Sequence, residues 1–289
     1  MSTSEEESNN QLAGLAPQVA ELAVRAGHAI LEIYGGDFEV ETKADSSPLT
    51  QADLASQEII VAGLAQLTPD LPVLAEETGE LPFEERRSWR RSWLVDPLDG
   101  TREFVKRNGE FTVNIAMVEA GQPILGVVHA PVLGVTYLAS RGGGARRLDA
   151  SGERSIAVSP PPDNELHDGE LHGGELRIVM SRSHANEATL RFIGRLEREY
   201  RVNAVSQGSA LKMCLVADGT AHIYPRLGPT MEWDVAAAQC VVEEAGGQLV
   251  TLDGAPMGFN RPNLVNESFL ACYGDAEKWL RLLGNTGNG

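Results

Sequence analysis

Hydrophobic residues recur at helical spacing over residues 12–35, and Gly35 and Gly36 follow as a helix C-terminal signal. Residues 1–11 are polar and acidic, so we expect a disordered tail there. Residues 38–42 alternate like a short strand. A second helix is predicted over 47–67, with a proline near its start.

Two apolar runs, 71–77 and 92–97, are typical of strands that deliver acidic residues at their C-terminal ends. Residues 111–140 are rich in β-branched residues interrupted by turn signals, which predicts a meander of three strands. Strands and helices alternate beyond a segment, 159–175, that is rich in proline and charge. An antiparallel meander inside an alternating pattern favours layered α/β sheets over a purely doubly wound fold.

The proline-rich segment divides the chain into a predicted N-terminal α+β domain, residues 12–160, and a C-terminal α/β domain, residues 161–289. With 42% hydrophobic residues in 289, the chain has enough apolar material for a large core. No apolar run reaches the ~18 residues that a bilayer-spanning helix needs. The N-terminus lacks the basic and apolar regions of a signal peptide.

The net charge of −17 argues against a nucleic-acid polymer as partner, because phosphate backbones are bound by basic surfaces. A small phosphorylated ligand remains compatible if its charge is met locally. The three cysteines have no CxxC spacing, so neither a disulfide framework nor a zinc site is expected. A cytoplasmic location fits best. The basic cluster at 86–93 has two readings, attraction of an anion and balance of the surrounding acids, of which we expect the second.

The stretch WLVDPLDGT, residues 93–101, carries the clearest chemistry. Asp96, Asp99 and the carbonyl of Leu98 can supply three hard oxygens of the kind that Mg²⁺ prefers. Pro97 fixes the backbone and Gly100 frees it, which favours one tight turn. The amides that follow can bind a phosphate oxygen. A plain β-turn with solvated acids is the alternative reading.

Three further sets of acids have an ordinary structural reading, and the first two have a chemical one as well. Glu76 and Glu77 end the preceding strand; they are either solvated or converge with Asp96 on a metal. Asp53 is spaced from Thr50 as in a helix-capping arrangement, but it can also accept a proton from the hydroxyl of Thr101. Asp234 precedes an alanine-rich helix and would serve as an ordinary N-cap.

Taken together, the blocks AEE (75–77), WLVDPLDGT (93–101) and WDVAAAQCVVEEAGG (233–247) resemble the inositol monophosphatase superfamily of Mg²⁺-dependent phosphatases. The resemblance covers nearly the whole chain and implies an αβαβα sandwich with mixed sheets. It implies two or three Mg²⁺ ions held by Glu76, Asp96, the Leu98 carbonyl, Asp99 and Asp234. It also makes Asp53 and Thr101 the pair that activates water, and Glu77 a more distant carboxylate or a ligand of a third metal.

Within the superfamily, SRSHANE (181–187), GSALKMCLVADG (208–219) and YPRLGPTMEWD (224–234) resemble the CysQ-type 3'(2'),5'-bisphosphate nucleotidases. The substrate contacts that this branch implies are Gly100, Thr101, His184, Ser209, Lys212, Arg226 and Asp234. Two cations away from the metals suit a substrate with a second phosphate. Ala210 stands where a second serine is more usual, so one hydroxyl is missing.

The sequence therefore predicts metal-dependent hydrolysis of 3'-phosphoadenosine 5'-phosphate to AMP and phosphate by a monomer or homodimer. The metals are expected in the N-terminal domain and the substrate contacts largely in the C-terminal one. A phosphatase acting on inositol 1-phosphate or on sugar phosphates is the alternative within the class. A non-catalytic nucleotide or Mg²⁺ sensor on the same fold is the alternative outside it; retention of the acids in all three blocks argues against that reading.

Overall fold

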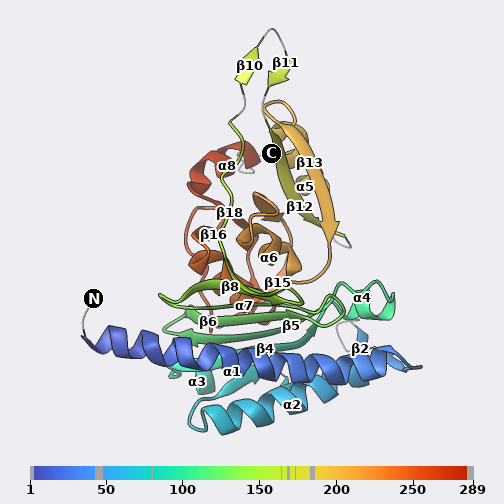
Figure 1. Cartoon of the computed structure of the whole chain (residues 1–289), viewed down its shortest axis with the longest axis vertical. Helices are drawn as coiled ribbons and strands as arrows, with labels where there is room; N and C mark the ends of the chain where they lie inside the picture. The colour runs from blue at the N-terminus through green and yellow to red at the C-terminus, as the bar shows by residue number, and fades with distance from the viewer. Residues whose placement is uncertain are drawn as a thin grey trace.

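The computed structural model describes residues 3–42, 48–79, 81–163, 165–167, 170–172, 174–182 and 186–284. Helices and sheets alternate in layers (Figure 1): α1 and α2, a first sheet, α6 and α7, a second sheet, and α5 with α8. The predicted αβαβα sandwich is confirmed. The division into two domains stays a prediction. Among the described residues, no helix has the length and apolar character required to span a membrane.

Helix α1 (Thr3–Tyr34) confirms the first predicted helix but begins well before residue 12. Residues 3–11, which the sequence assigns to a disordered tail, are its first turns. Glutamates in the first turn, Glu5 and Glu6, favour a helix N-terminus because they complement its dipole. Asn9 lies against the turn at Gly142, where an added Cβ would be 2.8 Å from its amide nitrogen.

Helix α2 (Gln51–Leu67) starts later than predicted, because Thr50 caps it and the residues before it are extended. Strand β2 (Pro48–Thr50) pairs with β1 (Val40–Thr42) instead of forming the first helical turn. Both α1 and α2 pack on one face of the first sheet, where their apolar stripes form a continuous core.

Within the described residues, the first sheet has the order β3-β4-β5-β6-β7-β8-β9. Its strands are β3 (Val73–Ala75), β4 (Arg91–Asp99), β5 (Thr112–Glu119), β6 (Gln122–Ala130), β7 (Val135–Ser140), β8 (Gly144–Asp149) and β9 (Gly152–Ile156). The predicted meander is confirmed as β5, β6 and β7. Strands β3 and β4 are parallel, with Ala75 opposite Val95, so Glu76 and Asp96 emerge at the same end of neighbouring strands.

The DPLD segment ends β4 as a bulge, not as the tight turn expected from the sequence. Asp96 pairs with Asn114 and Asp99 with Thr112, so two residues of β4 face one of β5. Pro97 has no N–H to give to the ladder, which suits the extra position. Gly100 follows with φ of +94°, and α4 (Thr101–Val105) begins directly after it.

The second sheet, counted over the described residues, has the order β13-β12-β14-β18-β16. Its strands are β12 (Glu175–Ser181), β13 (Arg201–Gln207), β14 (Ile223–Arg226), β16 (Gly247–Thr251) and β18 (Phe269–Tyr273). Strands β12 and β13 are parallel and end together at Ser181 and Gln207. Helices α5 (Glu187–Leu196) and α8 (Ala276–Leu283) cover its outer face.

Helices α6 (Leu211–Ala217) and α7 (Glu232–Glu244) lie between the sheets and join their cores (Figure 1). An added Cβ at Gly126 of β6 would be 2.2 Å from the Ala237 carbonyl, so the glycine permits α7 to lie directly on the sheet. All three cysteines are buried as free thiols. The remaining short elements are η1 (Glu76–Thr78), α3 (Phe83–Arg86), β10 (Glu165–His167), β11 (Glu170–His172), β15 (Thr230–Met231) and β17 (Val265–Asn266).

Candidate active site

The end of β4 meets the start of α2 at a hydroxyl–carboxylate pair. Thr101 Oγ1 lies 3.2 Å from Asp53 Oδ1 and 3.3 Å from the Leu98 carbonyl oxygen. The other Asp53 oxygen accepts from the Thr50 amide at 2.8 Å and the Thr50 hydroxyl at 2.7 Å. Asp53 therefore fulfils both readings of the sequence at once: one oxygen completes a capping box and the other faces Thr101.

Two residues that the sequence analysis did not single out fix the shape of this segment. The Ser56 hydroxyl of α2 donates to the Pro97 carbonyl at 2.7 Å, and the Asn114 amide of β5 lies 3.5 Å from Asp99 Oδ2. The Leu98 amide donates to Asp96 Oδ1 at 3.0 Å, which closes a local turn inside the bulge. Ser56 and Asn114 give only a weak signal in the sequence, because a serine in a helix and an asparagine in a strand are common.

Glu76 and Glu77 begin the short helix η1 directly after β3. The Glu77 amide donates to the Gln57 side chain of α2 at 3.0 Å, which ties this turn to the same helix that carries Asp53. The Coulombic effect of Glu76 reaches both Asp96 and Asp234. The acids at the C-terminal ends of β3 and β4 are therefore close enough to interact electrostatically.

Asp234 lies in the first turn of α7, three residues after the cap. The N-cap is Met231, whose amide donates to Asp234 Oδ2 at 2.8 Å. The expectation that Asp234 is itself the N-cap is therefore wrong. Met231 pairs with Val265 between β15 and β17, which holds the residues before Glu232 extended and moves the helix start. The side chain of Asp234 still faces the acids of the first sheet.

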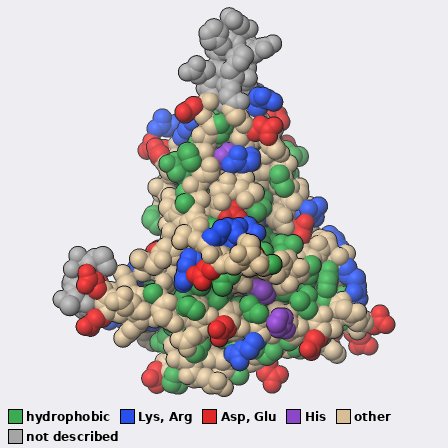
Figure 2. Space-filling model, in the orientation of Figure 1, with side chains coloured by type: hydrophobic (Ala, Val, Ile, Leu, Met, Phe, Trp, Pro, Cys, Tyr) green, Lys and Arg blue, Asp and Glu red, His purple; other side chains and the backbone are tan. Residues whose placement is uncertain are grey.

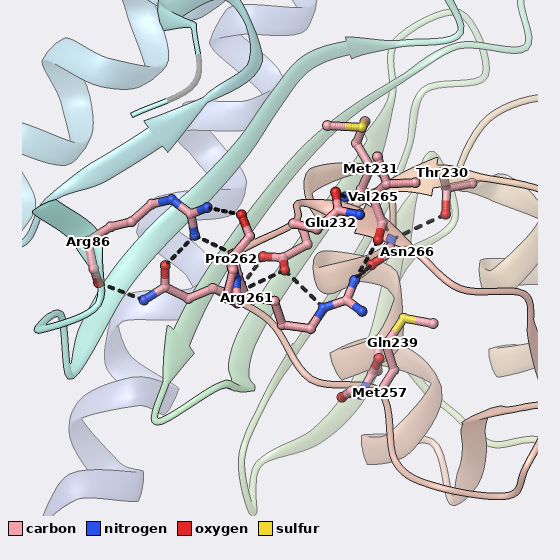
Figure 3. A network of polar contacts seen from close by, with 12 residues as sticks. Arg86, Thr230, Met231, Glu232, Gln239, Met257, Arg261, Pro262, Val265 and Asn266 are labelled. Atoms are coloured by element: carbon pink, nitrogen blue, oxygen red, sulfur yellow. Dashed lines mark hydrogen bonds and ion pairs between the residues drawn. The ribbon is translucent and has the colours of Figure 1, made fainter. Parts of the chain in front are cut away.

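A buried polar network holds the N-terminus of α7 in place (Figure 3). The fully buried carboxylate of Glu232 accepts from the amides of Asn260 and Arg261 at 2.6 and 3.0 Å. The Arg261 guanidinium lies 3.2 Å from Glu232 and 2.8 Å from Asn266, whose amide donates to the Met231 carbonyl at 2.7 Å. Because these bonds hold Glu232 of α7 and Met231 directly before it, the network fixes the position from which Asp234 projects.

Arg86 extends this network to the first half of the chain. Its guanidinium donates to Asn260 Oδ1 at 2.9 Å and to the carbonyls of Arg261 and Pro262 at 2.7 and 3.1 Å (Figure 3). Only 2% of Arg86 is exposed. The expectation that the 86–93 cluster simply balances nearby acids is therefore wrong for Arg86, because these contacts are to an amide side chain and to carbonyls.

Three of the predicted substrate residues lie in the second half of the chain, near the second sheet. Ser209 follows β13, Lys212 is in the first turn of α6, and Arg226 ends β14. The Lys212 ammonium donates to the Ser209 carbonyl and lies 5.6 Å from the Tyr224 ring centre. Arg226 donates to the Pro229 carbonyl at 2.6 Å, and its buried Nε has no hydrogen-bond partner among the described residues. Ser209 has φ of +51°, an uncommon conformation for a residue with a side chain. His184 lies outside the described residues.

A cavity of about 350 Å³ brings the two groups of residues together. Its lining includes Asp99, Gly100, Thr101 and Asp234 together with Ser209, Lys212 and Arg226. Residues that the sequence reading did not name also line it: Arg102, Glu103, Ser181, Tyr224, Thr230 and Val265. The cavity opens at the carboxyl ends of parallel strands, where α/β proteins commonly bind ligands.

Burial and mutual repulsion dominate the electrostatics of the acids. Burial, and then Glu76, Asp99 and Asp234, raise the pKa of Asp96 well above its ordinary value. Burial and Asp99 raise the pKa of Asp234 to about 8. Burial also raises the pKa of Asp99, against the opposing effect of Lys212. On the cation side, burial lowers the pKa of Lys212 to about 8.

These carboxylates fit a hard divalent cation by their chemistry. Hard oxygens are the donors that Mg²⁺ takes, and buried carboxylates that repel one another are stabilised by a positive ion. No three acidic, histidine or cysteine side chains of the described chain stand close enough to form a ready-made metal cluster. Oxygen donors of the kind that Mg²⁺ takes are therefore present, and two of them, Asp99 and Asp234, line the cavity.

Comparison with known proteins gives the family. The model of the inositol monophosphatase family matches residues 13–281. The chain belongs to the inositol monophosphatase family. It is 44% identical over 257 residues to the 3'(2'),5'-bisphosphate nucleotidase CysQ of Escherichia coli strain K12, which covers 87% of this chain and 97% of that protein.

Solved structures of the family have the same fold. CysQ of Bacteroides thetaiotaomicron superposes with a TM-score of 0.76 at 36% identity, over 88% of this chain and 96% of that one. An IMPase of Thermotoga maritima superposes with a TM-score of 0.74 at 28% identity, over 91% and 94%. The family expected from the three sequence blocks is confirmed.

Proposed function

We propose that this chain is a Mg²⁺-dependent phosphomonoesterase that removes the 3'-phosphate of 3'-phosphoadenosine 5'-phosphate, giving AMP and inorganic phosphate. One observation carries the proposal: a single cavity is lined both by the carboxylates Asp99 and Asp234 and by the cations Lys212 and Arg226. Such a cavity suits a ligand with two phosphates, one met by a metal and one by side chains. The relatives named as 3'(2'),5'-bisphosphate nucleotidases support this substrate.

The metal would be held by the acids around the bulge of β4. We assign Asp96, the Leu98 carbonyl, Asp99, Asp234 and Glu76 as its ligands, with Glu77 more distant or at a third ion. When bound, Mg²⁺ supplies positive charge to the phosphate oxygens and lowers the pKa of water. Calorimetric titration with Mg²⁺ tests the two or three ions expected, and Asp99→Asn should remove at least one of them.

The proton of the attacking water is assigned to the Thr101–Asp53 pair. The Thr101 hydroxyl donates to Asp53 Oδ1 and can accept from a water on its cavity side. Thr50 holds the opposite Asp53 oxygen through two hydrogen bonds, so the carboxylate keeps its orientation while Thr101 passes a proton. Neither residue needs to form a covalent bond with the phosphate.

The second phosphate is assigned to Lys212 and Arg226. Lys212 is 7% exposed, and within the part of the chain that the structure describes the buried Arg226 Nε has no hydrogen-bond partner, so an anionic ligand suits both cations. Gly100 and Thr101 contribute backbone amides to the phosphate that is cleaved. The assignments of Ser209 and His184 to the nucleotide rest on the resemblance alone.

Phosphate release from 3'-phosphoadenosine 5'-phosphate and from inositol 1-phosphate, each with Mg²⁺ and with EDTA, tests the proposal. We expect Mg²⁺-dependent release with a higher kcat/KM for the nucleotide. Lys212→Met and Arg226→Met should abolish the preference for the nucleotide and leave slow hydrolysis of inositol 1-phosphate. A higher kcat/KM for inositol 1-phosphate in the wild type would overturn the nucleotide assignment, and release in EDTA would overturn the metal assignment.

A further inference from the structure

We propose that Glu110 is a positioning residue of the active site, which holds the Ser209–Lys212 loop at a fixed place relative to the Asp99–Thr101 segment. Glu110 lies between α4 and β5 and does not line the cavity. The inference rests on the proposed function, because it assumes that Lys212 binds the substrate. It assigns to Glu110 the placement of that lysine.

The Glu110 carboxylate binds both parallel strand ends of the second sheet. It accepts from Arg182 at 2.8 and 2.7 Å, directly after β12, and from the Gly208 amide at 2.8 Å, directly after β13. Arg182 also donates to the Ser206 carbonyl at 2.9 Å. A bidentate guanidinium–carboxylate pair has a defined geometry as well as strength. One side chain of the first half of the molecule therefore fixes two loops of the second half.

The backbone of Glu110 is equally constrained, because it lies between two glycines. A Cβ added to Gly208 would be 2.7 Å from the Glu110 carbonyl oxygen, and one added to Gly100 would be 3.2 Å from the same oxygen. Gly100 ends the metal-binding segment and Gly208 begins the substrate loop. Because Gly100 and Gly208 have no side chains, both segments can approach the Glu110 backbone this closely.

The contact continues into the cavity. The Ala210 amide donates to the Asp99 carboxylate, so the loop that begins at Gly208 also reaches the assigned metal ligand. Lys212 follows on the first turn of α6 and donates to the Ser209 carbonyl. A loop released at Gly208 would move Ser209 and Lys212, while Asp53 and Thr101, held within the first half, would keep their places.

Glu110→Gln tests the proposal, because it removes the charge and one of the two acceptor oxygens. We expect KM for 3'-phosphoadenosine 5'-phosphate to rise about tenfold, a change that corresponds to about 1.4 kcal/mol of binding. We expect kcat to fall less than threefold, and KM for 3'-AMP, which has no second phosphate, to change less than threefold. Arg182→Gln should reproduce the same pattern, and Arg182→Lys should restore part of the affinity.

Glu119→Gln is the matched control. Glu119 ends the same strand that Glu110 precedes, and its side chain is 16% exposed as that of Glu110 is. It binds two guanidinium groups, of Arg91 and Arg141, where Glu110 binds one guanidinium and one amide. Its loss should leave both KM values unchanged. Equal KM values for Glu110→Gln and Glu119→Gln would overturn the proposal, as would a Glu110→Gln variant that loses kcat and thermal stability together without a change in KM. If Glu110→Gln does not fold, Arg182→Gln decides by the same comparison.

The wild type separates this proposal from the proposed function. If it prefers another phosphate ester, the nucleotide assignment fails. The positioning role of Glu110 is then tested by comparing the KM of Glu110→Gln for that preferred ester with the KM of Glu119→Gln. A rise confined to Glu110→Gln would support the positioning role without the nucleotide, and no difference would overturn it.

Discussion

At the scale of single residues, the site depends on side chains that do two things at once. Asp53 caps α2 with one oxygen and faces the Thr101 hydroxyl with the other. The bulge of β4 places the Leu98 carbonyl within reach of the same hydroxyl. A hydroxyl held between a carboxylate and a carbonyl has its hydrogen directed away from the cavity, so a lone pair is left for a water.

Removing this hydroxyl should slow the chemical step. Thr101→Val keeps the shape of the side chain but removes the hydroxyl that faces Asp53 Oδ1, so we expect kcat to fall by about 10²–10⁴ with little change in KM. Thr101→Ser keeps the hydroxyl and should retain most of kcat. Steady-state kinetics of both variants on the same substrate provides the measurement. Equal rates for the two would show that the pair does not carry the proton.

Substitution of Asp96 should raise the stability of the metal-free protein and lower its activity. Burial and neighbouring carboxylates raise its pKa, so its ionised form destabilises the fold at every pH above its ordinary value of 3.8. Asp96→Asn keeps an acceptor for the Leu98 amide and removes this charge. In EDTA at pH 7 the variant should therefore be more stable than the wild type by about 1 kcal/mol or more.

The same variant should hydrolyse phosphate esters at least ~100-fold more slowly, since a neutral amide is a poor Mg²⁺ ligand. Urea unfolding in EDTA and phosphate release in Mg²⁺ give the two measurements. Hydrolysis that survives the substitution would mean that Asp96 is not a metal ligand. A loss of both activity and stability would point to misfolding instead of a lost ligand.

At the scale of elements, the sequence was informative where the contacts are local. The DPLDGT segment could be recognised because its acids, proline and glycine are contiguous, and α7 because its alanines and valines have helical spacing. Strand β13 was missed because it is a half-exposed edge strand without a clean hydrophobic alternation. Tertiary pairing with β12, which no local pattern records, makes it a strand.

The supporting residues were missed for the same physical reason. Ser56 contacts a carbonyl 41 residues away, and Glu110 an amide 98 residues away. The buried Arg86 binds a loop more than 170 residues further along the chain. Such contacts exist only once the sheets have formed, so single residues of ordinary type gave no signal. The family blocks include Asp99, Thr101 and Asp234, which line the cavity, but not Ser56, Arg86 or Glu110, which support the segments around it.

Packing of α1 on the first sheet leads to a pH-dependent stability. His129 of β6 is 5% exposed, bonds the Thr136 hydroxyl at 2.8 Å, and lies under Gly27 of α1, where an added Cβ would be 2.7 Å from the ring. Burial and, less strongly, His28 lower its pKa from 6.5 to about 4. Between pH 6.5 and about 4, His129 is therefore protonated in the unfolded chain but neutral in the folded protein.

Because the unfolded chain binds more protons than the fold in this range, acidification destabilises the fold. Stability from His129 is complete above pH 6.5 and is lost as the pH falls toward 4, by about 2–3 kcal/mol in total. His129→Asn removes this proton while leaving a polar atom near Thr136. We expect the free-energy difference between wild type and variant in urea unfolding to shrink by that amount from pH 7 to 4.5. A difference that stays constant would show that His129 titrates normally in the fold.

At the scale of the whole molecule, the charge balance is the dominant feature. The chain has 41 acidic and 24 basic residues, a net charge of −17. Figure 2 shows Lys and Arg side chains scattered among the acidic ones on the visible face. Exposed pairs such as Arg191–Glu187 and Arg281–Glu277 stabilise by less than about 1 kcal/mol each. General repulsion acts over the Debye length, about 30 Å at 0.01 M salt, and so involves many more charges.

Salt should therefore stabilise the fold, because it screens the repulsion of the whole surface more than it weakens the few favourable pairs. Raising sodium chloride from 0.01 to 0.15 M in EDTA shortens the Debye length to about 8 Å. We expect Tm to rise by on the order of 3 °C, which corresponds to about 1 kcal/mol for a chain of this size. Tetramethylammonium chloride should give the same rise, since screening depends on ionic strength and not on the cation. A rise with sodium alone would indicate a bound cation, and a fall in Tm with both salts would mean that the ion pairs outweigh the repulsion.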